Sequence, residues 1–143
     1  MGIYTQQQWE KLPNGRQWSP NEICIIIPPK LSYSKVSGIY KINFKDHFYI
    51  GKSTHIVSRA SLHACAFRRS IISEIPKNDK ISKFLLANSD LYVLYLEVLE
   101  LCKPKFLVER EQFYLNKFFT DPKCLNSKAK SVPNNNKENE IRY

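Results

Sequence analysis

The stretch that decides the fold runs from Gly38-Ile39-Tyr40 to Tyr49-Ile50-Gly51, with eight residues between the two triplets. This pattern predicts a strand over 37–42 and an antiparallel partner over 47–50, joined by a turn at 43–46. The chain has 143 residues but only four glycines, and two of them lie beside these tyrosines. Glycine serves where backbone turns sharply or approaches another group closely, so this placement suits two phenols offered to one ligand.

A helix is predicted directly after this pair of strands. Ser53 or Thr54 suits its N-cap, and apolar residues at helical spacing form one face. Arg59 and His63 lie one helical turn apart at the margin of that face, so both can point at one anion. From the residues alone, the alternative is a solvated arginine and a half-buried histidine. The apolar face consists of Ile56, Val57, Ala60, Ala64, Phe67 and Ile71.

The second half of the chain predicts a short helix over 79–88, a partly buried strand over 91–101 and a final helix from Pro104 to about residue 119. Glu111 on the final helix has only apolar or aromatic neighbours at the three- and four-residue spacings. A carboxylate in such surroundings is costly unless it is half of a buried ion pair or a metal ligand. A lone carboxylate suits Mg²⁺, or Mn²⁺, because such an ion keeps most of its waters. The four neighbours are Leu107, Val108, Tyr114 and Leu115.

The composition indicates one globular domain with a polyanionic partner. Hydrophobic residues make up 43% of the chain and aromatic residues 13%, which excludes a disordered protein. The formal net charge is +9, so nucleic acid is the leading candidate for the partner. Lys52, together with Arg68 and Arg69 facing solvent on the helix, is expected to contact DNA. Charge alone leaves open a soluble protein of high isoelectric point that binds no nucleic acid.

Three regions are expected along the chain. Residues 1–35 form an N-terminal extension that serves DNA recognition or dimerisation, residues 36–127 form the main domain, and residues 128–143 form a flexible polar tail. Within the extension, the apolar run at 23–27 is compatible with one buried strand. That run is too short to span a bilayer, and residues 1–17 do not resemble a signal peptide, so an intracellular protein without a membrane partner is expected. The four cysteines include no C-x-x-C pair, so a zinc site has no support.

The chain contains, in this order, two tyrosine triplets, a helical arginine, a helical glutamate and a late asparagine. This order resembles the GIY-YIG nuclease family over roughly residues 36–127. The resemblance implies an α/β fold of the α+β type, with a small three-stranded antiparallel sheet flanked by helices. It also implies hydrolysis of DNA phosphodiester bonds with one divalent ion and no small-molecule cofactor. The matching residues are Tyr40, Tyr49, Arg59, His63, Glu111 and Asn126.

The resemblance also implies roles for these residues. Tyr40 would position or deprotonate the attacking water, and Tyr49 would support the site by hydrogen bonding. Arg59 would stabilise charge on the phosphate, Glu111 would hold the metal, and Asn126 would order the site.

A phenol with an ordinary pKa near ~10 is a poor base at neutral pH, so Tyr40 would need a cationic neighbour. Lys52 or His63 could serve, and the residues do not decide between them.

Homing nucleases of this family usually carry a further DNA-binding domain, and too few residues follow Asn126 here to form one. The pattern therefore resembles the compact restriction enzymes of the family, which would cleave both strands most simply as a homodimer. The alternatives are a homing-type, repair or phage endonuclease, and a non-catalytic DNA-binding module that kept the scaffold.

Overall fold

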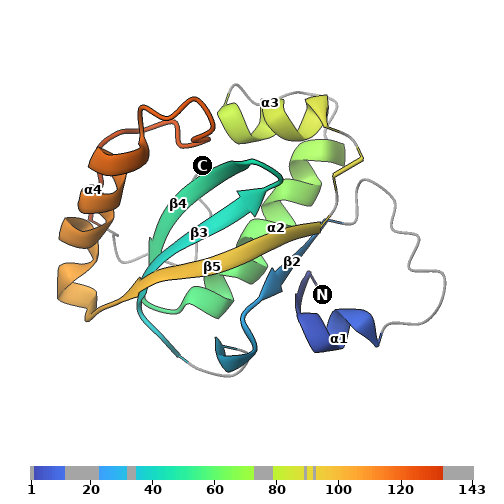
Figure 1. Ribbon diagram of the computed structural model, residues 1–143, viewed down its shortest axis with the longest axis horizontal. Coiled ribbons are helices and arrows are strands. Elements are labelled where there is room, and N and C mark those ends of the chain that lie inside the picture. The colour runs from blue at the N-terminus through green and yellow to red at the C-terminus, as the bar shows by residue number, and fades with distance from the viewer. Residues whose placement is uncertain are drawn as a thin grey trace.

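The computed structural model describes residues 2–11, 23–31, 35–72, 79–88, 90–91 and 93–133. Residues 134–143 of the tail predicted to be flexible lie outside this part of the chain. The centre of the molecule is a five-stranded mixed sheet in the order β1-β2-β5-β3-β4 (Figure 1). The strands are β1 (Ile3–Thr5), β2 (Cys24–Ile27), β3 (Gly38–Phe44), β4 (His47–Ser53) and β5 (Val93–Leu101).

Helices lie on both faces of this sheet. Buried side chains of α2 pack on one face of the β3-β4 hairpin, and those of α4 pack on the other. Among the described residues, no helix is long and apolar enough to cross a bilayer. The helices are α1 (Gln6–Glu10), α2 (Ile56–Ile72), α3 (Lys80–Ala87) and α4 (Leu107–Phe118), with short 3-10 turns η1 (Pro29–Leu31) and η2 (Pro104–Phe106).

The sheet corrects the prediction of three antiparallel strands. Strands β5, β3 and β4 are antiparallel neighbours as expected, but β1 and β2 of the N-terminal extension continue the same sheet. Strand β2 pairs with β5 in parallel, and β1 pairs with β2 in parallel. The apolar pattern of β2 correctly indicated a buried strand. It could not indicate the partner, because that strand lies nearly 70 residues further along the chain.

The hairpin register puts the two tyrosines on one face. Tyr40 pairs with Gly51, and Ile42 pairs with Tyr49, so these four side-chain positions point toward α2. The strands extend further than predicted, and the turn contains only Lys45 and Asp46.

Helix α2 begins at Ile56, later than an N-cap at either Ser53 or Thr54 predicts. Ser53 instead ends β4, and its Oγ accepts a hydrogen bond of 2.9 Å from the amide of His55. The predicted apolar face is confirmed at Ile56, Ala60, Ala64 and Phe67, which are all buried. The side chain of Ile71 lies outside the described part of the structure.

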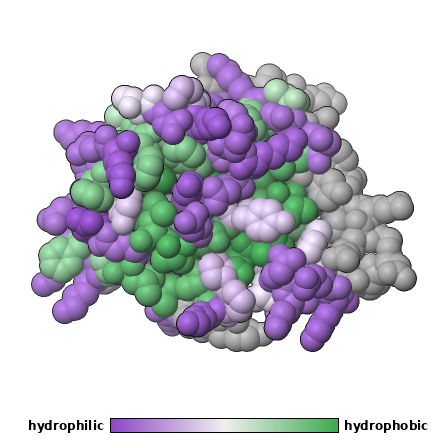
Figure 2. Space-filling view, in the orientation of Figure 1, coloured by the Kyte–Doolittle hydropathy of each residue, from purple (hydrophilic) through white to green (hydrophobic). Residues whose placement is uncertain are grey.

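The second face of the sheet is covered unevenly. The α4 side chains Leu107 and Leu115 pack against Ile39 and Ile50 at the β4 side. Strand β5, by contrast, leaves Tyr95 and Leu101 about half exposed. Figure 2 shows the result, an apolar area over the strands with hydrophilic side chains around it. Helices α2 and α4 therefore approach β4 from opposite faces, and most of the predicted site residues lie on or beside this strand.

Candidate active site

Tyr40 is buried, with 1% of its surface exposed, and its phenol crosses the neighbouring strand. The phenol oxygen lies 2.6 Å from Nε2 of His63, within hydrogen-bonding distance. A Cβ added to Gly51 would overlap the ring and the hydroxyl of Tyr40. Gly51 is therefore required because the phenol of Tyr40 occupies the space that a side chain at this position would fill.

His63 lies on α2 with its ring fully buried. Its ring stacks on Phe67 with centroids 5.4 Å apart, and it meets Tyr40 and Tyr49 edge-to-face at 5.8 and 5.4 Å. Burial first, and then the charge of Arg59, lower the pKa of His63 to about 3. The imidazole is consequently neutral near pH 7. It can share a hydrogen bond with Tyr40, but it carries no positive charge. His63 is therefore not the cationic neighbour that Tyr40 would need.

Tyr49 lies on β4 beside the same imidazole. Burial first, and then the charge of Glu111, raise its pKa to about 12 against the opposing effect of Arg59. Its phenol therefore stays protonated at physiological pH and can donate a hydrogen bond. The charges that act on the Tyr49 phenol therefore come from both α4 and α2.

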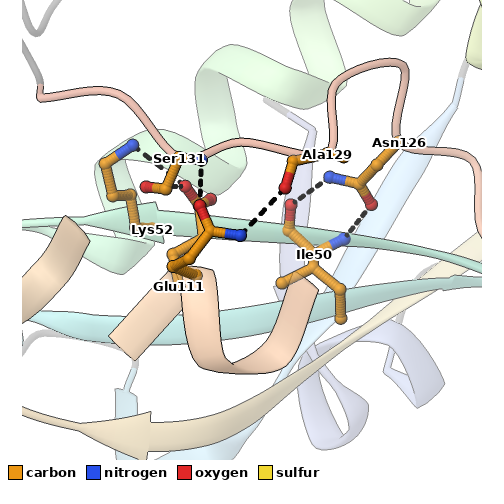
Figure 3. Close-up of polar contacts among 7 residues, drawn as sticks. Ile50, Lys52, Glu111, Asn126, Ala129 and Ser131 are labelled. Atoms are coloured by element: carbon orange, nitrogen blue, oxygen red, sulfur yellow. Dashed lines mark hydrogen bonds and ion pairs between the residues drawn. The ribbon is translucent and has the colours of Figure 1, made fainter. Parts of the chain in front are cut away.

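Glu111 is buried on α4 and forms an ion pair with Lys52 of β4. The distance from Nζ to Oε1 is 3.0 Å, and the two side chains are only 9% and 10% exposed. The hydroxyl of Ser131 donates a second hydrogen bond of 2.6 Å to the same oxygen (Figure 3). The sequence left two explanations for a carboxylate among apolar neighbours, an ion pair or a metal ligand. The structure shows the buried ion pair. Within the described part of the chain, both hydrogen bonds of this carboxylate reach Oε1, which leaves Oε2 for a further partner.

Asn126 lies at the outer edge of β4 and pairs with the backbone of Ile50. Its Oδ1 accepts from the Ile50 amide and its Nδ2 donates to the Ile50 carbonyl, both at 2.8 Å (Figure 3). Just before it, the amide of Leu125 donates to the Phe48 carbonyl at 2.7 Å. The chain after α4 thus continues the hydrogen bonding of the sheet over part of this edge. If Asn126 orders the site, it does so by holding strand β4 in place.

No family model matches the sequence, and no curated protein matches it. Among solved structures, the chain is similar to the catalytic domain of the intron endonuclease I-TevI, in a mutant form, with a TM-score of 0.52. The identity is 18%, and the match covers 66% of this chain and 95% of that domain. The chain has the fold of a GIY-YIG nuclease domain. The prediction made from the tyrosine triplets is confirmed at the level of the fold.

The described residues around strand β4 offer a donor set that fits one kind of metal ion. Among the residues that the structure describes, no three His, Cys, Asp or Glu side chains gather to form a protein cage. The charge of Glu111 acts on the phenol of Tyr49, and its Oε2 makes no hydrogen bond or ion pair with the residues that the structure describes. A hard ion that keeps several waters and also binds phosphate oxygens fits such a single carboxylate.

The basic residues predicted to contact DNA lie in three different environments. Lys52 is paired with Glu111 in a nearly buried position. Arg68 does not face solvent as predicted, because it is half-buried and its Nε donates a 3.0 Å hydrogen bond to the carbonyl of Ile23, just before β2. Arg69, the next residue on α2, is exposed as predicted. The two adjacent arginines of α2 therefore differ: Arg68 holds part of the structure together, and Arg69 is accessible to a nucleic acid.

Two residues of the candidate site were missed by the sequence reasoning. Ser131 reaches Glu111 directly, and Gln112 binds the segment that carries Ser131 through its Nε2 and Oε1 atoms. Ser131 lies in a polar stretch without apolar periodicity, so no pattern marked it. Gln112 is adjacent to Glu111 in the sequence, but glutamine on a helix is too common to indicate a site.

Proposed function

We propose that this protein is a DNA endonuclease that hydrolyses phosphodiester bonds with one divalent metal ion, Mg²⁺ or Mn²⁺. The observation that carries the proposal is the convergence of Tyr40, Tyr49, His63 and Glu111 around strand β4. The fold that holds them resembles the catalytic domain of an intron endonuclease. The net charge of +9 suits a DNA substrate, since it favours association with a polyanion.

In this proposal Tyr40 orients the attacking water. His63 is neutral, so its Nε2 can accept the phenol proton in a hydrogen bond and hold the ring in place. The phenol held in this way would then orient a water molecule. A positioned acid–base group typically contributes about 10²–10⁴-fold to a reaction rate. With a pKa of about 3, His63 stores no proton at neutral pH, so it acts on Tyr40 through orientation.

Tyr49 and Arg59 would stabilise the phosphate. The phenol of Tyr49 keeps its proton, since its pKa is raised to about 12, and can donate it in a hydrogen bond to a non-bridging oxygen. The guanidinium of Arg59 supplies a fixed positive charge with a planar geometry that matches phosphate oxygens. Donors that are in place before the charge develops lower the barrier without reorganisation, which is the largest single effect in many enzymes.

Glu111 would hold the metal ion through Oε2, while Lys52 and Ser131 occupy Oε1. When bound, such an ion acts as a Lewis acid that neutralises charge on the phosphate and on the leaving oxygen. Lys52 balances the buried carboxylate while the ion is away, because an unpaired charge at this depth is costly.

For the biological role we propose site-specific double-strand cleavage of the restriction type by a homodimer. Homing, repair and phage endonucleases are the alternatives within the same chemistry. Sequencing the ends of cleaved DNA separates them. Symmetric ends at discrete sites support the restriction type, one long and tolerant site supports homing, and cleavage at branches or lesions supports repair.

Plasmid cleavage tests the proposal. Purified protein is incubated with supercoiled plasmid and Mg²⁺ or Mn²⁺ over a range of salt concentrations. We expect Glu111→Ala and Tyr40→Phe to reduce the rate by about 100-fold or more. Glu109→Ala and Tyr95→Phe are matched controls, because Glu109 is an exposed acid on the same helix and Tyr95 is a half-exposed tyrosine on β5. Both controls should cleave like the unmodified chain.

Two results would contradict the proposed nuclease function or its metal ligand. If the unmodified chain binds DNA but cuts none under all these conditions, the non-catalytic binding module replaces the enzyme. If Glu111→Ala cuts at the unmodified rate, Glu111 is not the metal ligand.

A further inference from the structure

We infer that Ser131 is a positioning residue that fixes the carboxylate of Glu111, and that residues 126–131, here called the strap, exist in this fold to deliver it. The inference deepens the proposed function, on which its consequence for metal binding rests. It assigns a role to a segment that the sequence pattern grouped mostly with the polar tail.

The first end of the strap is fastened to the sheet. Asn126 makes both of its 2.8 Å hydrogen bonds with the backbone of Ile50 on β4 and is itself buried. An amide side chain that satisfies both backbone groups of an edge residue holds the chain as a strand neighbour would. The strap therefore leaves the β4 edge at a defined place, two residues before the position of Lys52 on the same strand.

The second end of the strap is fastened to α4. Gln112 donates from Nε2 to the Ala129 carbonyl at 3.0 Å and accepts at Oε1 from the Ser131 amide at 2.8 Å. Its Nε2 also contacts Oδ1 of Asn116 at 2.8 Å, one helical turn further along. The side chain that anchors the strap thus belongs to the residue that directly follows Glu111. Figure 3 shows the strap passing from Asn126 over Ile50 to Ser131, which lies beside Glu111.

These two attachments place one hydroxyl on the carboxylate. Ser131 is 7% exposed, and its Oγ lies 2.6 Å from Oε1 of Glu111, the oxygen that also receives Lys52. Two donors on one oxygen distinguish the two carboxylate oxygens and oppose rotation about the last side-chain bond. A hydroxyl does this without adding a charge that would repel a cation. Carboxylate ligands of metal ions commonly depend on such hydrogen bonds from surrounding groups.

A Mn²⁺ titration followed by electron paramagnetic resonance tests the inference without requiring catalysis. We expect Ser131→Ala to bind Mn²⁺ about 10-fold more weakly than the unmodified chain, within the range typical of residues that support a metal ligand. The Mg²⁺ concentration for half-maximal plasmid cleavage should rise by a similar factor. Ser131→Thr keeps a hydroxyl and should restore binding. Ser127→Ala is the matched control, because Ser127 lies in the strap but is exposed.

Thermal unfolding separates positioning from a loss of structure. If Ser131→Ala also unfolds at a much lower temperature, Gln112→Ala decides, since it releases the second end of the strap while leaving the hydroxyl in the chain. Gln112→Ala should then weaken Mn²⁺ binding as well, and unchanged binding in a folded Gln112→Ala protein would overturn the inference.

The remaining outcomes are distinct from those of the cleavage test. Equal Mn²⁺ affinity and equal Mg²⁺ dependence for Ser131→Ala and the unmodified chain overturn the inference, even if the protein cuts DNA. Failure of the unmodified chain to bind Mn²⁺ overturns it too. If Ser131→Ala weakens Mn²⁺ binding but no chain cuts DNA, the positioning role stands and the proposed nuclease function fails.

Discussion

Gly51 lies where the phenol of Tyr40 crosses strand β4, so the position of the Tyr40 ring depends on a glycine at residue 51. The glycine has no side chain, and the ring uses the free space to reach His63 on the neighbouring helix. The sequence marked both residues as unusual, but the register of the hairpin is what pairs them.

We expect Gly51→Ala to lower the free energy of unfolding by about 1–3 kcal/mol, the usual cost of adding atoms to a packed site. The methyl group should also displace the phenol and slow DNA cleavage. Urea denaturation of Gly51→Ala, Tyr40→Ala and the double variant measures the effect as a cycle. In the Tyr40→Ala background the extra methyl should cost much less. An equal cost in both backgrounds would mean that the phenol is not what excludes a side chain.

His63 makes the stability of the protein dependent on pH. Its pKa is about 3 in the folded chain, below the ordinary value of 6.5, so the unfolded state binds more protons between these values. The contribution of the neutral ring is fully present above pH 6.5 and is lost as the pH falls toward 3, with a slope of at most about 1.4 kcal/mol per pH unit. Denaturation of the unmodified chain and His63→Gln at several pH values tests this. Identical slopes for the two proteins would contradict the prediction.

At the scale of elements, α2 connects the site to the N-terminal extension. One face carries His63 into the core, and Arg68, further along, donates to the carbonyl of Ile23 just before β2. Helix α2 therefore joins two parts of the chain that the sequence treated as separate regions.

Arg68 and Arg69 allow a matched comparison of adjacent residues. We expect Arg68→Ala to reduce the free energy of unfolding by about 1–3 kcal/mol, because a buried carbonyl loses a charged donor. Arg69→Ala should leave stability nearly unchanged and reduce the salt dependence of DNA binding by about one unit of slope, as for loss of a single phosphate contact. Chemical denaturation and binding titrations at several salt concentrations measure both effects. If Arg68→Ala instead reduced the salt dependence of DNA binding and Arg69→Ala reduced the free energy of unfolding, Arg68 would be the DNA contact.

At the scale of the whole molecule, the extension and the hairpin belong to one sheet. Strand β2 covers the edge of β5 that β3 leaves free, and Ile23, Ile25 and Leu94 are fully buried there. That the extension also recognises DNA or mediates dimerisation stays a prediction.

Deleting residues 1–35 should therefore unfold or aggregate the remaining chain. Each buried isoleucine contributes about 1.5–3 kcal/mol, so the loss of Ile23, Ile25, Ile26 and Ile27 approaches the whole stability of a typical domain. The exposed β5 edge would in addition offer unpaired backbone groups to other molecules. Circular dichroism and size-exclusion chromatography of the truncated chain measure this. A monomeric product with unchanged cooperative unfolding would show that residues 36–143 fold independently.

The sequence by itself determined the hairpin with its two tyrosines, the apolar face of α2, the buried strand β2 and the anomaly of Glu111. These features are local, since strand and helix periods appear within a few consecutive residues and a carboxylate among apolar neighbours is conspicuous on its own helix. The resemblance of the motif order predicted the GIY-YIG fold, but not the two N-terminal strands that extend its sheet in parallel.

Only the tertiary structure decided which residues become partners. Lys52 meets Glu111 across 59 positions, Asn126 meets Ile50 across 76, and Arg68 meets Ile23 across 45. No periodicity records such pairs, because each results from the packing of whole elements against one another. The same cause neutralises His63, whose low pKa arises from burial by strands and helices that lie elsewhere in the chain.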